Sequence, residues 1–300
     1  MGATAPLTPD RVLRRLEWHV IRRLEGRLQG DHRTTLRGHG TDYLDLREYE
    51  YGDDVRHIDW NVSARMDSVF VREFNEDREL TAWLLVDRSA SMTFGTAERT
   101  KEQVGSEVAA TFAQLLVRGG NRVGAILYDN DIQRTIPPRQ GRDQVLLLLR
   151  ELLRSPRTAR SGNGAVTNLS GLLDLAARIL RRRSLVVIVS DFISEPGWEQ
   201  PLLRLAARHE VVAVRLVDRR EFELPDAGLV VVEDAETGEQ LLVDTSDSEL
   251  RRRLRAAGVE RERALIQATA GAGVDLYTIA TDDDLVPTFV RMAQSRRRRR

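Results

Sequence analysis

The sequence contains no cysteine. This absence excludes a disulfide-stapled scaffold, a thiolate zinc or iron–sulfur site and catalysis by a thiol. Long hydrophobic runs are also missing: the longest apolar stretches, such as residues 185–189, are too short to span a bilayer. The first ten residues have no basic start followed by an apolar core, so a secretory signal is not expected. We therefore predict a cytoplasmic protein.

Neither sign of charge is in excess, because 46 basic residues balance 46 acidic ones among 300. This balance argues against a general polyanion-binding protein. Lysine is almost absent and occurs once, as Lys101. Five arginines, Arg296 to Arg300, end the chain. A solvated tail is the favoured interpretation of this charge run, and contact with nucleic acid or an anionic membrane is the alternative.

From residue 80 onward, short β-branched or leucine-rich runs alternate with longer amphipathic stretches. This alternation is typical of an α/β fold with an open, mostly parallel sheet covered by helices. The expected strands are 82–86, 123–128, 185–190, 211–217 and 274–279, with a shorter one after the turn at 129–131. The expected helices are 101–117, 143–153, 169–180, 202–208, 248–270 and 285–292. Residues 229–232 and 240–243 flank Glu236-Thr237-Gly238 and predict a hairpin.

The first 79 residues differ in composition: they are polar, have no regular apolar pattern and are rich in turn-forming residues. A helix is expected to begin near Asp10 and to carry apolar residues at helical spacing as far as Leu28. Residues 69–74 alternate as a strand does. We predict a smaller α+β segment over 1–79, an α/β domain over 80–293 with a hairpin insertion around 218–245, and a basic tail over 294–300.

Hydroxyl and carboxylate side chains follow the predicted strands. A buried strand ends at Asp87, and Ser89 and Ser91 come next on a loop. In open α/β sheets, ligands bind beyond the carboxyl ends of the strands. Thr167, at the end of a glycine-containing loop, and Asp191, after a second buried strand, can reach the same edge. Five hard oxygen donors of this kind suit Mg²⁺ or Mn²⁺.

Plainer interpretations exist for each of these residues. Asp87 and the two serines could form a helix cap and a polar turn, and Thr167 could cap the next helix. Asp191 could accept hydrogen bonds from backbone amides. A second cluster, Gly52-Asp53-Asp54 with His57 and Asp59, could be a metal or acid–base site. We favour a turn with ion pairs to arginines there, because no ligand spacing is distinctive.

Neither the remaining histidines nor the glycine pairs indicate a further site. The histidines outside this cluster are expected to be exposed; they stand at positions 19, 32, 39 and 209. The glycine pairs 119–120 and 162/164 match neither nucleotide-binding motif, GxxxxGK[ST] or GxGxxG, so no organic cofactor is expected.

The arrangement of Asp87-x-Ser89-x-Ser91, then Thr167, then Asp191 resembles the von Willebrand factor A domain and its metal-ion-dependent adhesion site. This resemblance covers about residues 80–292 and implies a von Willebrand factor A-type sheet with those five residues around the metal. Residues 46–61 with Ala64-Arg65 resemble a bacterial family known as "domain of unknown function 58". That family joins such a segment to a von Willebrand-like domain, and its members are typically encoded beside MoxR-type AAA+ ATPases.

These observations predict a metal-dependent adaptor for protein–protein interaction and not an enzyme. The resemblance implies a MoxR-type ATPase as partner, in the maturation or remodelling of a client complex that offers a Glu or Asp carboxylate. A Mg²⁺-dependent hydrolase using Asp87 and Asp191 is the alternative, although the sequence offers no evident base or nucleophile for it. Nucleic-acid binding through the arginine tail is a weaker alternative, and no small-molecule substrate is expected.

Overall fold

The computed structural model describes the chain with gaps, over residues 37–38, 42–51, 53, 55–66, 68–75, 80–96, 98–129, 131–154, 167–221, 225–233 and 239–298. These residues form two units, one between residues 37 and 75 and the other from Leu80 onward. The predicted helix 10–28 and most of the glycine-containing loop before Thr167 lie outside the described residues.

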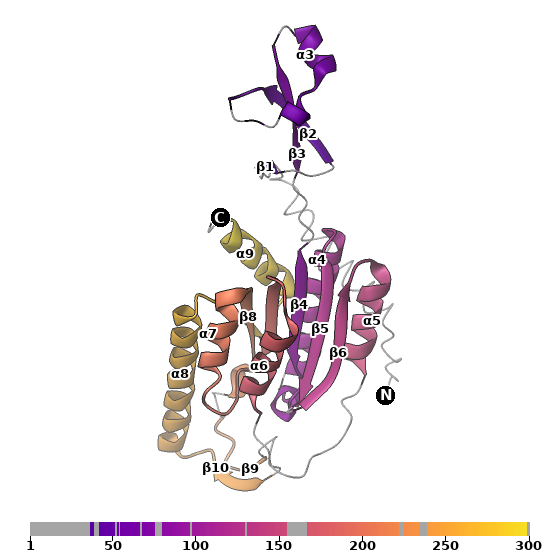
Figure 1. The fold of residues 1–300 in the computed structure, drawn as a ribbon. Helices are drawn as coiled ribbons and strands as arrows, with labels where there is room; N and C mark the ends of the chain where they lie inside the picture. Colours follow the sequence, from indigo (N-terminus) through magenta and orange to yellow (C-terminus); the bar gives the residue numbers. More distant parts are fainter. Residues whose placement is uncertain are drawn as a thin grey trace. The chain divides into compact units, whose positions relative to one another are not determined.

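The smaller unit is a three-stranded antiparallel sheet with one short helix (Figure 1). Its elements are β1 (Arg37–Gly38), β2 (Asp42–Glu48), a 3₁₀ turn (Val55–His57), α3 (Trp60–Met66) and β3 (Phe70–Asn75). Strand β3 lies between the other two and pairs with both, so the strand predicted at 69–74 is confirmed. Asp59 precedes α3, and its carboxylate accepts hydrogen bonds from the backbone N–H groups of Asn61 and Val62. This contact is an ordinary helix N-cap.

The larger unit is built on a six-stranded sheet in the order β11-β8-β7-β4-β5-β6. The strands are β4 (Thr81–Asp87), β5 (Arg122–Asp129), β6 (Asp131–Arg139), β7 (Leu185–Ser190), β8 (Glu210–Val217) and β11 (Asp275–Ala280). All neighbouring pairs are parallel except β5 with β6. The predicted open, mostly parallel sheet is therefore confirmed. The antiparallel strand β6 carries Pro137 and Pro138 at the sheet's edge, where a missing N–H donor is tolerated.

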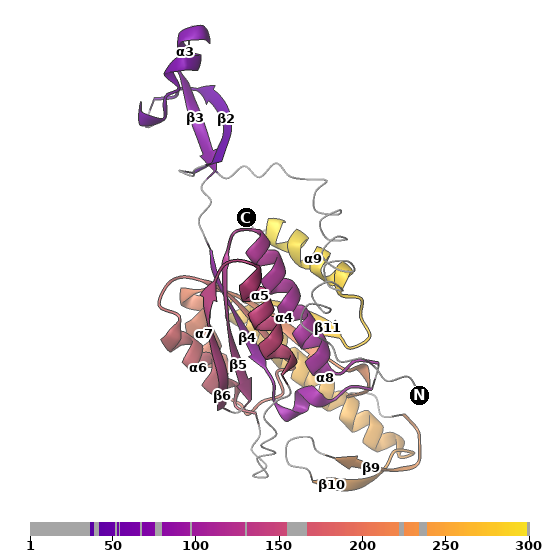
Figure 2. The ribbon, with the colours of Figure 1, turned by 90° about the vertical axis from the view of Figure 1, so that its right-hand side faces the viewer.

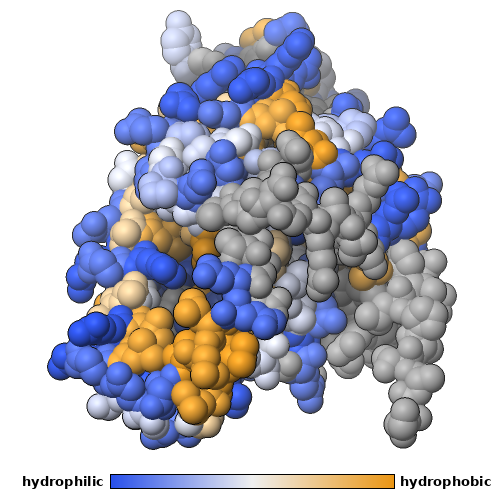
Figure 3. Space-filling view, turned by 90° about the horizontal axis from the view of Figure 1, so that it is seen from below, coloured by the Kyte–Doolittle hydropathy of each residue, from blue (hydrophilic) through white to orange (hydrophobic). Residues whose placement is uncertain are grey.

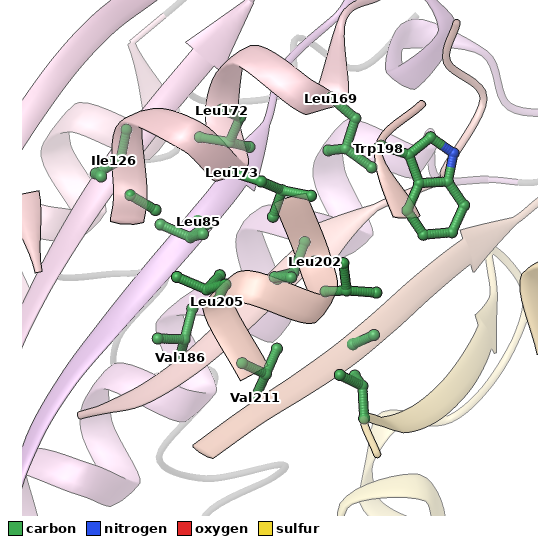
Figure 4. Packing of buried hydrophobic residues seen from close by; sticks show 14 of the residues in the cluster. Leu85, Ile126, Leu169, Leu172, Leu173, Val186, Trp198, Leu202, Leu205 and Val211 are labelled. Atoms are coloured by element: carbon green, nitrogen blue, oxygen red, sulfur yellow. The ribbon is translucent and has the colours of Figure 1, made fainter. Parts of the chain in front are cut away.

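Helices cover both faces of this sheet (Figure 2). The elements on one face are α4 (Lys101–Arg118), α5 (Arg142–Leu153) and α9 (Leu285–Arg298); those on the other are α6 (Leu169–Ile179), α7 (Glu199–Arg208) and α8 (Ser248–Gly271). On the second face, leucines of α6 and α7 pack onto Leu85, Ile126 and Val186 of the strands (Figure 4). Because both faces are covered, every residue of β7 is buried, as expected for a parallel sheet between helix layers.

The predicted hairpin is present as a separate two-stranded sheet, β9 (Leu229–Glu233) with β10 (Gln240–Asp244). Leu229, Val231 and Leu242 lie on one of its faces and are 69%, 62% and 66% exposed. Figure 3, which looks at the molecule from below, shows hydrophobic atoms gathered on this side. Between Asp226 and Leu250 the sequence has eight acidic residues and no basic one.

The closing helix is longer than its apolar pattern predicts. It was expected to end at 292 before a basic tail over 294–300, but α9 continues to Arg298. Arginine is a good helix former, which explains why the helix continues through this part of the sequence. Within the described ranges, no helix combines the length and apolar character needed to cross a bilayer.

Candidate functional site at the carboxyl edge of the sheet

Asp87 is the last residue of β4, whose parallel neighbours β5 and β7 end at the same edge of the sheet. Its carboxylate is almost inaccessible to solvent. One oxygen, Oδ1, accepts the backbone N–H of Ser89 at 2.9 Å, and the other, Oδ2, accepts the hydroxyl of Ser190 at 2.6 Å. These two contacts hold the carboxylate in one orientation toward the loop that follows β4.

Ser89 and Ser91 lie on that loop, which includes a 3₁₀ turn over Ala90–Thr93. Both are buried, and their hydroxyl groups form a hydrogen bond with each other in which the two oxygens are 3.0 Å apart. Two neighbouring oxygens in an octahedral Mg²⁺ shell, each 2.0–2.1 Å from the ion, are separated by about 2.9 Å. The spacing of the two hydroxyls therefore suits adjacent ligands of one small dication.

Asp191 follows β7 directly and is also buried. Its Oδ1 accepts the backbone N–H of Ile193 at 3.0 Å, and its Oδ2 accepts the Lys101 ammonium at 2.7 Å. The next residue, Phe192, has a φ of 58°, a left-handed conformation uncommon for a side chain of this size. Its N–H donates to the Ser190 hydroxyl at 2.9 Å. Ser190 thus connects the loop after β7 to Asp87.

Thr167 is buried immediately before α6, whose N-cap is Asn168. The predicted helix start at this point is confirmed. The carbonyl of Thr167 accepts hydrogen bonds from the Ser194 hydroxyl at 2.8 Å and from the Glu195 N–H at 3.0 Å. The backbone of Thr167 is therefore attached to the loop that carries Asp191.

Two buried carboxylates, Asp87 and Asp191, lie near each other at this edge. Burial first, and then the nearby Asp191, raise the pKa of Asp87 to about 7, despite the hydrogen bonds from Ser190 and Ser89 that oppose the shift. A buried carboxylate with a raised pKa is one whose charged form an added cation would stabilise. Of the two carboxylates Asp87 and Asp191, it is Asp191 that accepts a hydrogen bond from the Lys101 ammonium.

Three residues at this edge are not predicted as site residues by any local sequence pattern: Ser190, Lys101 and Glu221. The Lys101 ammonium is wholly buried and donates to carboxylate oxygens of both Asp191 and Glu221. Burial alone would lower the pKa of Lys101, but the two carboxylates raise it overall. One signal was available: Lys101 stands three residues before Val104, on the apolar stripe of its helix, where a charged side chain is unexpected.

The residues present fit a hard dication in their donor chemistry. Carboxylate and hydroxyl oxygens are the ligands that Mg²⁺ and Mn²⁺ prefer, and Asp87 would gain a counter-charge. Over the described residues, no cluster of three or more His, Cys, Asp or Glu forms a metal site of the usual kind. A site here would therefore depend on the serine and threonine hydroxyls. The structure brings Asp87, Ser89, Ser91 and Asp191 to one edge, and their ligand roles stay a prediction.

In the described part of the second cluster, Asp53 and Asp59 have the contacts of a structural turn. Arg47 forms a two-pronged ion pair with Asp53, with N–O distances of 2.8 and 2.5 Å. Asp53 also accepts the backbone N–H of Glu50, and Asp59 caps α3. These contacts agree with the interpretation as a turn with ion pairs.

The prediction that His209 is exposed was wrong. It ends α7, is 5% exposed, and neither ring nitrogen has a hydrogen-bond partner in the described structure. Its position explains the burial, because it stands between the last turn of α7 and the start of β8, which both pack into the core.

Fold and site together define an α/β protein with an open, mostly parallel sheet and hydroxyl and carboxylate groups at the carboxyl edge. Residues 45–264 match the family model described as "Protein of unknown function DUF58", and the chain belongs to this family. One relative is the uncharacterized protein Rv1480 of Mycobacterium tuberculosis. It is 38% identical over 286 residues, which cover 95% of this chain and 89% of the relative.

Among solved structures, BatB from Bacteroides thetaiotaomicron has a TM-score of 0.44 at 12% identity, covering 72% of this chain and 98% of that one. The SpRpn10 VWA domain has a TM-score of 0.35 at 17% identity, covering 71% and 94%. Manganese-loaded TRAP protein of Plasmodium vivax has a TM-score of 0.33 at 18% identity, covering 46% and 57%. With TM-scores below 0.5, these similarities are too distant to indicate a shared function.

Proposed function

We propose that this protein is an adaptor for protein–protein interaction that binds a partner through a divalent cation. Asp87, Ser89, Ser91 and Thr167 would hold Mg²⁺ or Mn²⁺, with Asp191 acting through water. The observation that carries the proposal is the pair of buried serine hydroxyls, 3.0 Å apart, on the loop whose first residue is the buried carboxylate Asp87. That geometry has the separation of two adjacent oxygens around a small dication.

The charge of the donor set favours a ligand from outside the protein. Hydroxyl groups contribute no charge, and the Asp191 carboxylate is already paired with Lys101. When bound, the cation would supply an open coordination position to a Glu or Asp of a partner. The residues that hold it lie on loops at the sheet edge, which is where open α/β sheets bind ligands.

The proposed partner is a MoxR-type AAA+ ATPase, or the client complex that this ATPase matures or remodels. The family resemblance of residues 46–61 and 64–65 supports this choice. We further propose that the protein binds without turnover, so purified protein should not hydrolyse phosphoesters, peptides or esters. Metal-dependent hydrolysis that is lost in Asp87→Ala would favour the alternative, a Mg²⁺-dependent hydrolase.

Metal binding is tested by calorimetric titration of Mg²⁺ and Mn²⁺ into wild type and Asp87→Ala. We expect wild type to bind and the variant not to bind, with the variant still folded, because Asp87 stands at a strand end and its buried charge is poorly compensated. Thr93→Ala is a matched control, since this exposed hydroxyl on the same loop contacts only a nearby carbonyl. Equal Mg²⁺ affinity in Asp87→Ala would remove the metal assignment.

Partner binding is tested by capture of the MoxR-type ATPase on immobilised protein. We expect retention in Mg²⁺ and loss in EDTA or in Ser89→Ala with Ser91→Ala, while Thr93→Ala behaves as wild type. Equal capture with and without metal would place the contact on another surface. Retention of nucleic acid that is salt-dependent and disappears on deleting residues 296–300 would instead favour the arginine-tail alternative.

A further inference from the structure

A buried ion pair lies beside the proposed metal site. Lys101 begins α4, and its ammonium is fully inaccessible. It donates to Asp191 at 2.7 Å and to Glu221, and it lies 6.0 Å from the centre of the Phe94 ring. The loop from the serines returns to the same place, because the Phe94 carbonyl accepts the Lys101 backbone N–H at 2.9 Å.

Burial of an ammonium costs several kcal/mol unless it is paired and hydrogen-bonded. Here the compensation comes from Asp191, a residue of the predicted metal site, and from Glu221, which is held in turn by a hydrogen bond from the Asp218 N–H at 3.2 Å. The other 45 basic residues of the chain are arginines. A compact ammonium with three rotatable donors suits a narrow position between two carboxylates, whereas a planar guanidinium is larger and rigid.

We propose that Lys101 is a resident counter-cation of the metal site. Glu221 shares this ammonium and so determines how strongly Lys101 neutralises the charge of Asp191. By neutralising Asp191, Lys101 limits the negative charge that a bound dication meets. The dication therefore keeps positive charge for an acidic side chain of the partner. This inference rests on the proposed function and adds two residues, Lys101 and Glu221, to the same site.

A purely structural role is the competing explanation. The ion pair joins the start of α4 to the loops after β7 and β8, and it would stabilise the fold in that way alone. Arg215, which pairs in register with Ser190 on β7, is a second cation whose charge interacts with Asp191 and Glu221. Its ion pair, however, is with Glu262 at 3.6 Å. The two explanations differ in what they predict for metal affinity.

The test is calorimetric titration of Mg²⁺ and Mn²⁺ into full-length wild type, Lys101→Met and Glu221→Gln. Removing the lysine charge should tighten Mg²⁺ binding by about tenfold, or about 1.4 kcal/mol, because a like charge near the dication is lost. Glu221→Gln should weaken binding several-fold, because Lys101 then acts on Asp191 alone. Arg99→Met is the control: it removes a cation paired with Glu107 near the start of α4 and should leave the affinity unchanged.

Lys101→Met leaves two buried carboxylates unpaired and can fail to fold without metal. In that case, thermal unfolding of Lys101→Met is compared in MgCl₂ and in NaCl of equal ionic strength. Cooperative unfolding that returns only in MgCl₂ supports the proposal. The affinity is then measured with Glu221→Gln. If wild type binds Mg²⁺ and both variants bind it with the same affinity, Lys101 has only a structural role, and the proposed function stands. If wild type does not bind but Lys101→Met does, the counter-cation role holds and the metal-dependent function fails. Absence of binding in all variants overturns both.

Discussion

At the scale of single residues, His209 shows what burial does to an ionisable group. Its ring is enclosed between α7 and β8 without hydrogen-bond partners in the described structure. Burial, and secondly the charge of Arg208, lower the pKa of His209 below its ordinary value. The imidazole is therefore neutral in the folded protein at pH values where an unfolded chain already binds a proton.

The pH dependence of unfolding follows from this shift. A lowered folded-state pKa means that the unfolded state binds more protons below about pH 6.5. The free energy of unfolding should therefore fall as the pH falls below that value, by at most about 1.4 kcal/mol per pH unit from this residue. We expect His209→Leu to lose this component, measured by urea denaturation at several pH values. The other histidines remain in the variant, so any difference in pH dependence comes from His209. If His209→Leu and wild type have the same pH dependence of the free energy of unfolding, the prediction is contradicted.

The sequence predicts residue roles only where a local pattern carries them. Asp87, Ser89 and Ser91 are adjacent along the chain, so their spacing shows that they share a loop. Lys101 meets Asp191 across 90 residues, and nothing local to either residue specifies that contact. The same reason explains the error at His209, because its burial depends on two elements that pack together in three dimensions.

At the scale of elements, α4 is the helix that positions Lys101, and its start is fixed by a capping box. The Thr100 hydroxyl accepts the Gln103 N–H at 3.3 Å, and the Gln103 side chain accepts the Thr100 N–H at 3.0 Å. These reciprocal contacts satisfy two backbone donors of the first turn. They also set the point at which the lysine side chain leaves the helix.

We expect Thr100→Ala to lower the free energy of unfolding by about 1 kcal/mol, because the cap is lost. Thr100→Ser retains the hydroxyl and should be close to wild type. Chemical denaturation of the three proteins measures the difference. Equal destabilisation by both substitutions would show that the methyl group, and not the cap, is responsible.

The elements themselves were largely predictable from the sequence. Apolar runs and helical spacing located the strands and helices of the larger unit to within a few residues. The apolar pattern predicts that α7 begins at 202, whereas the helix begins three residues earlier, at Glu199. Pro201 obscured it, because proline is tolerated in the first turn of a helix yet usually marks a boundary. Trp198, the N-cap, makes no side-chain cap that a pattern could reveal.

At the scale of the whole molecule, distant parts of the chain meet at Asp218. Its carboxylate accepts the N–H and hydroxyl of Thr96 at 2.8 and 2.7 Å, the Thr281 hydroxyl at 2.9 Å and the Arg220 N–H at 3.0 Å. Burial would raise the pKa of Asp218, but these hydrogen bonds lower it overall. The loop that follows the serines is thereby connected to the ends of β8 and β11.

We expect Asp218→Ala to lower the free energy of unfolding by about 2 kcal/mol, because donors on three segments lose their common acceptor, and one of them, the Thr281 hydroxyl, is buried. Asp282→Ala is the matched control, since it removes an exposed ion pair with Arg219 that should contribute little. Thermal and urea unfolding compare the variants. A small effect of Asp218→Ala, similar to that of Asp282→Ala, would contradict this role.

The fold class was predictable because alternating strands and helices favour one architecture. The convergence of Asp87 and Asp191 also follows, since parallel strands end at a common edge. Contacts of the Asp218 kind do not follow, because they depend on which strands become neighbours, and periodicity along the chain carries no such information.

The β9–β10 hairpin has a consequence for how the protein behaves at high concentration. Exposed leucine and valine side chains on a two-stranded sheet would promote edge-to-edge association of copies. The segment from Asp226 to Leu250 has eight acidic residues and no basic one. Asp226 and Glu249 pair with arginines that follow it, and the remaining negative charge opposes such association. We therefore expect charge repulsion at this hairpin to oppose association of copies at high concentration. This protection decreases as salt screens the carboxylates.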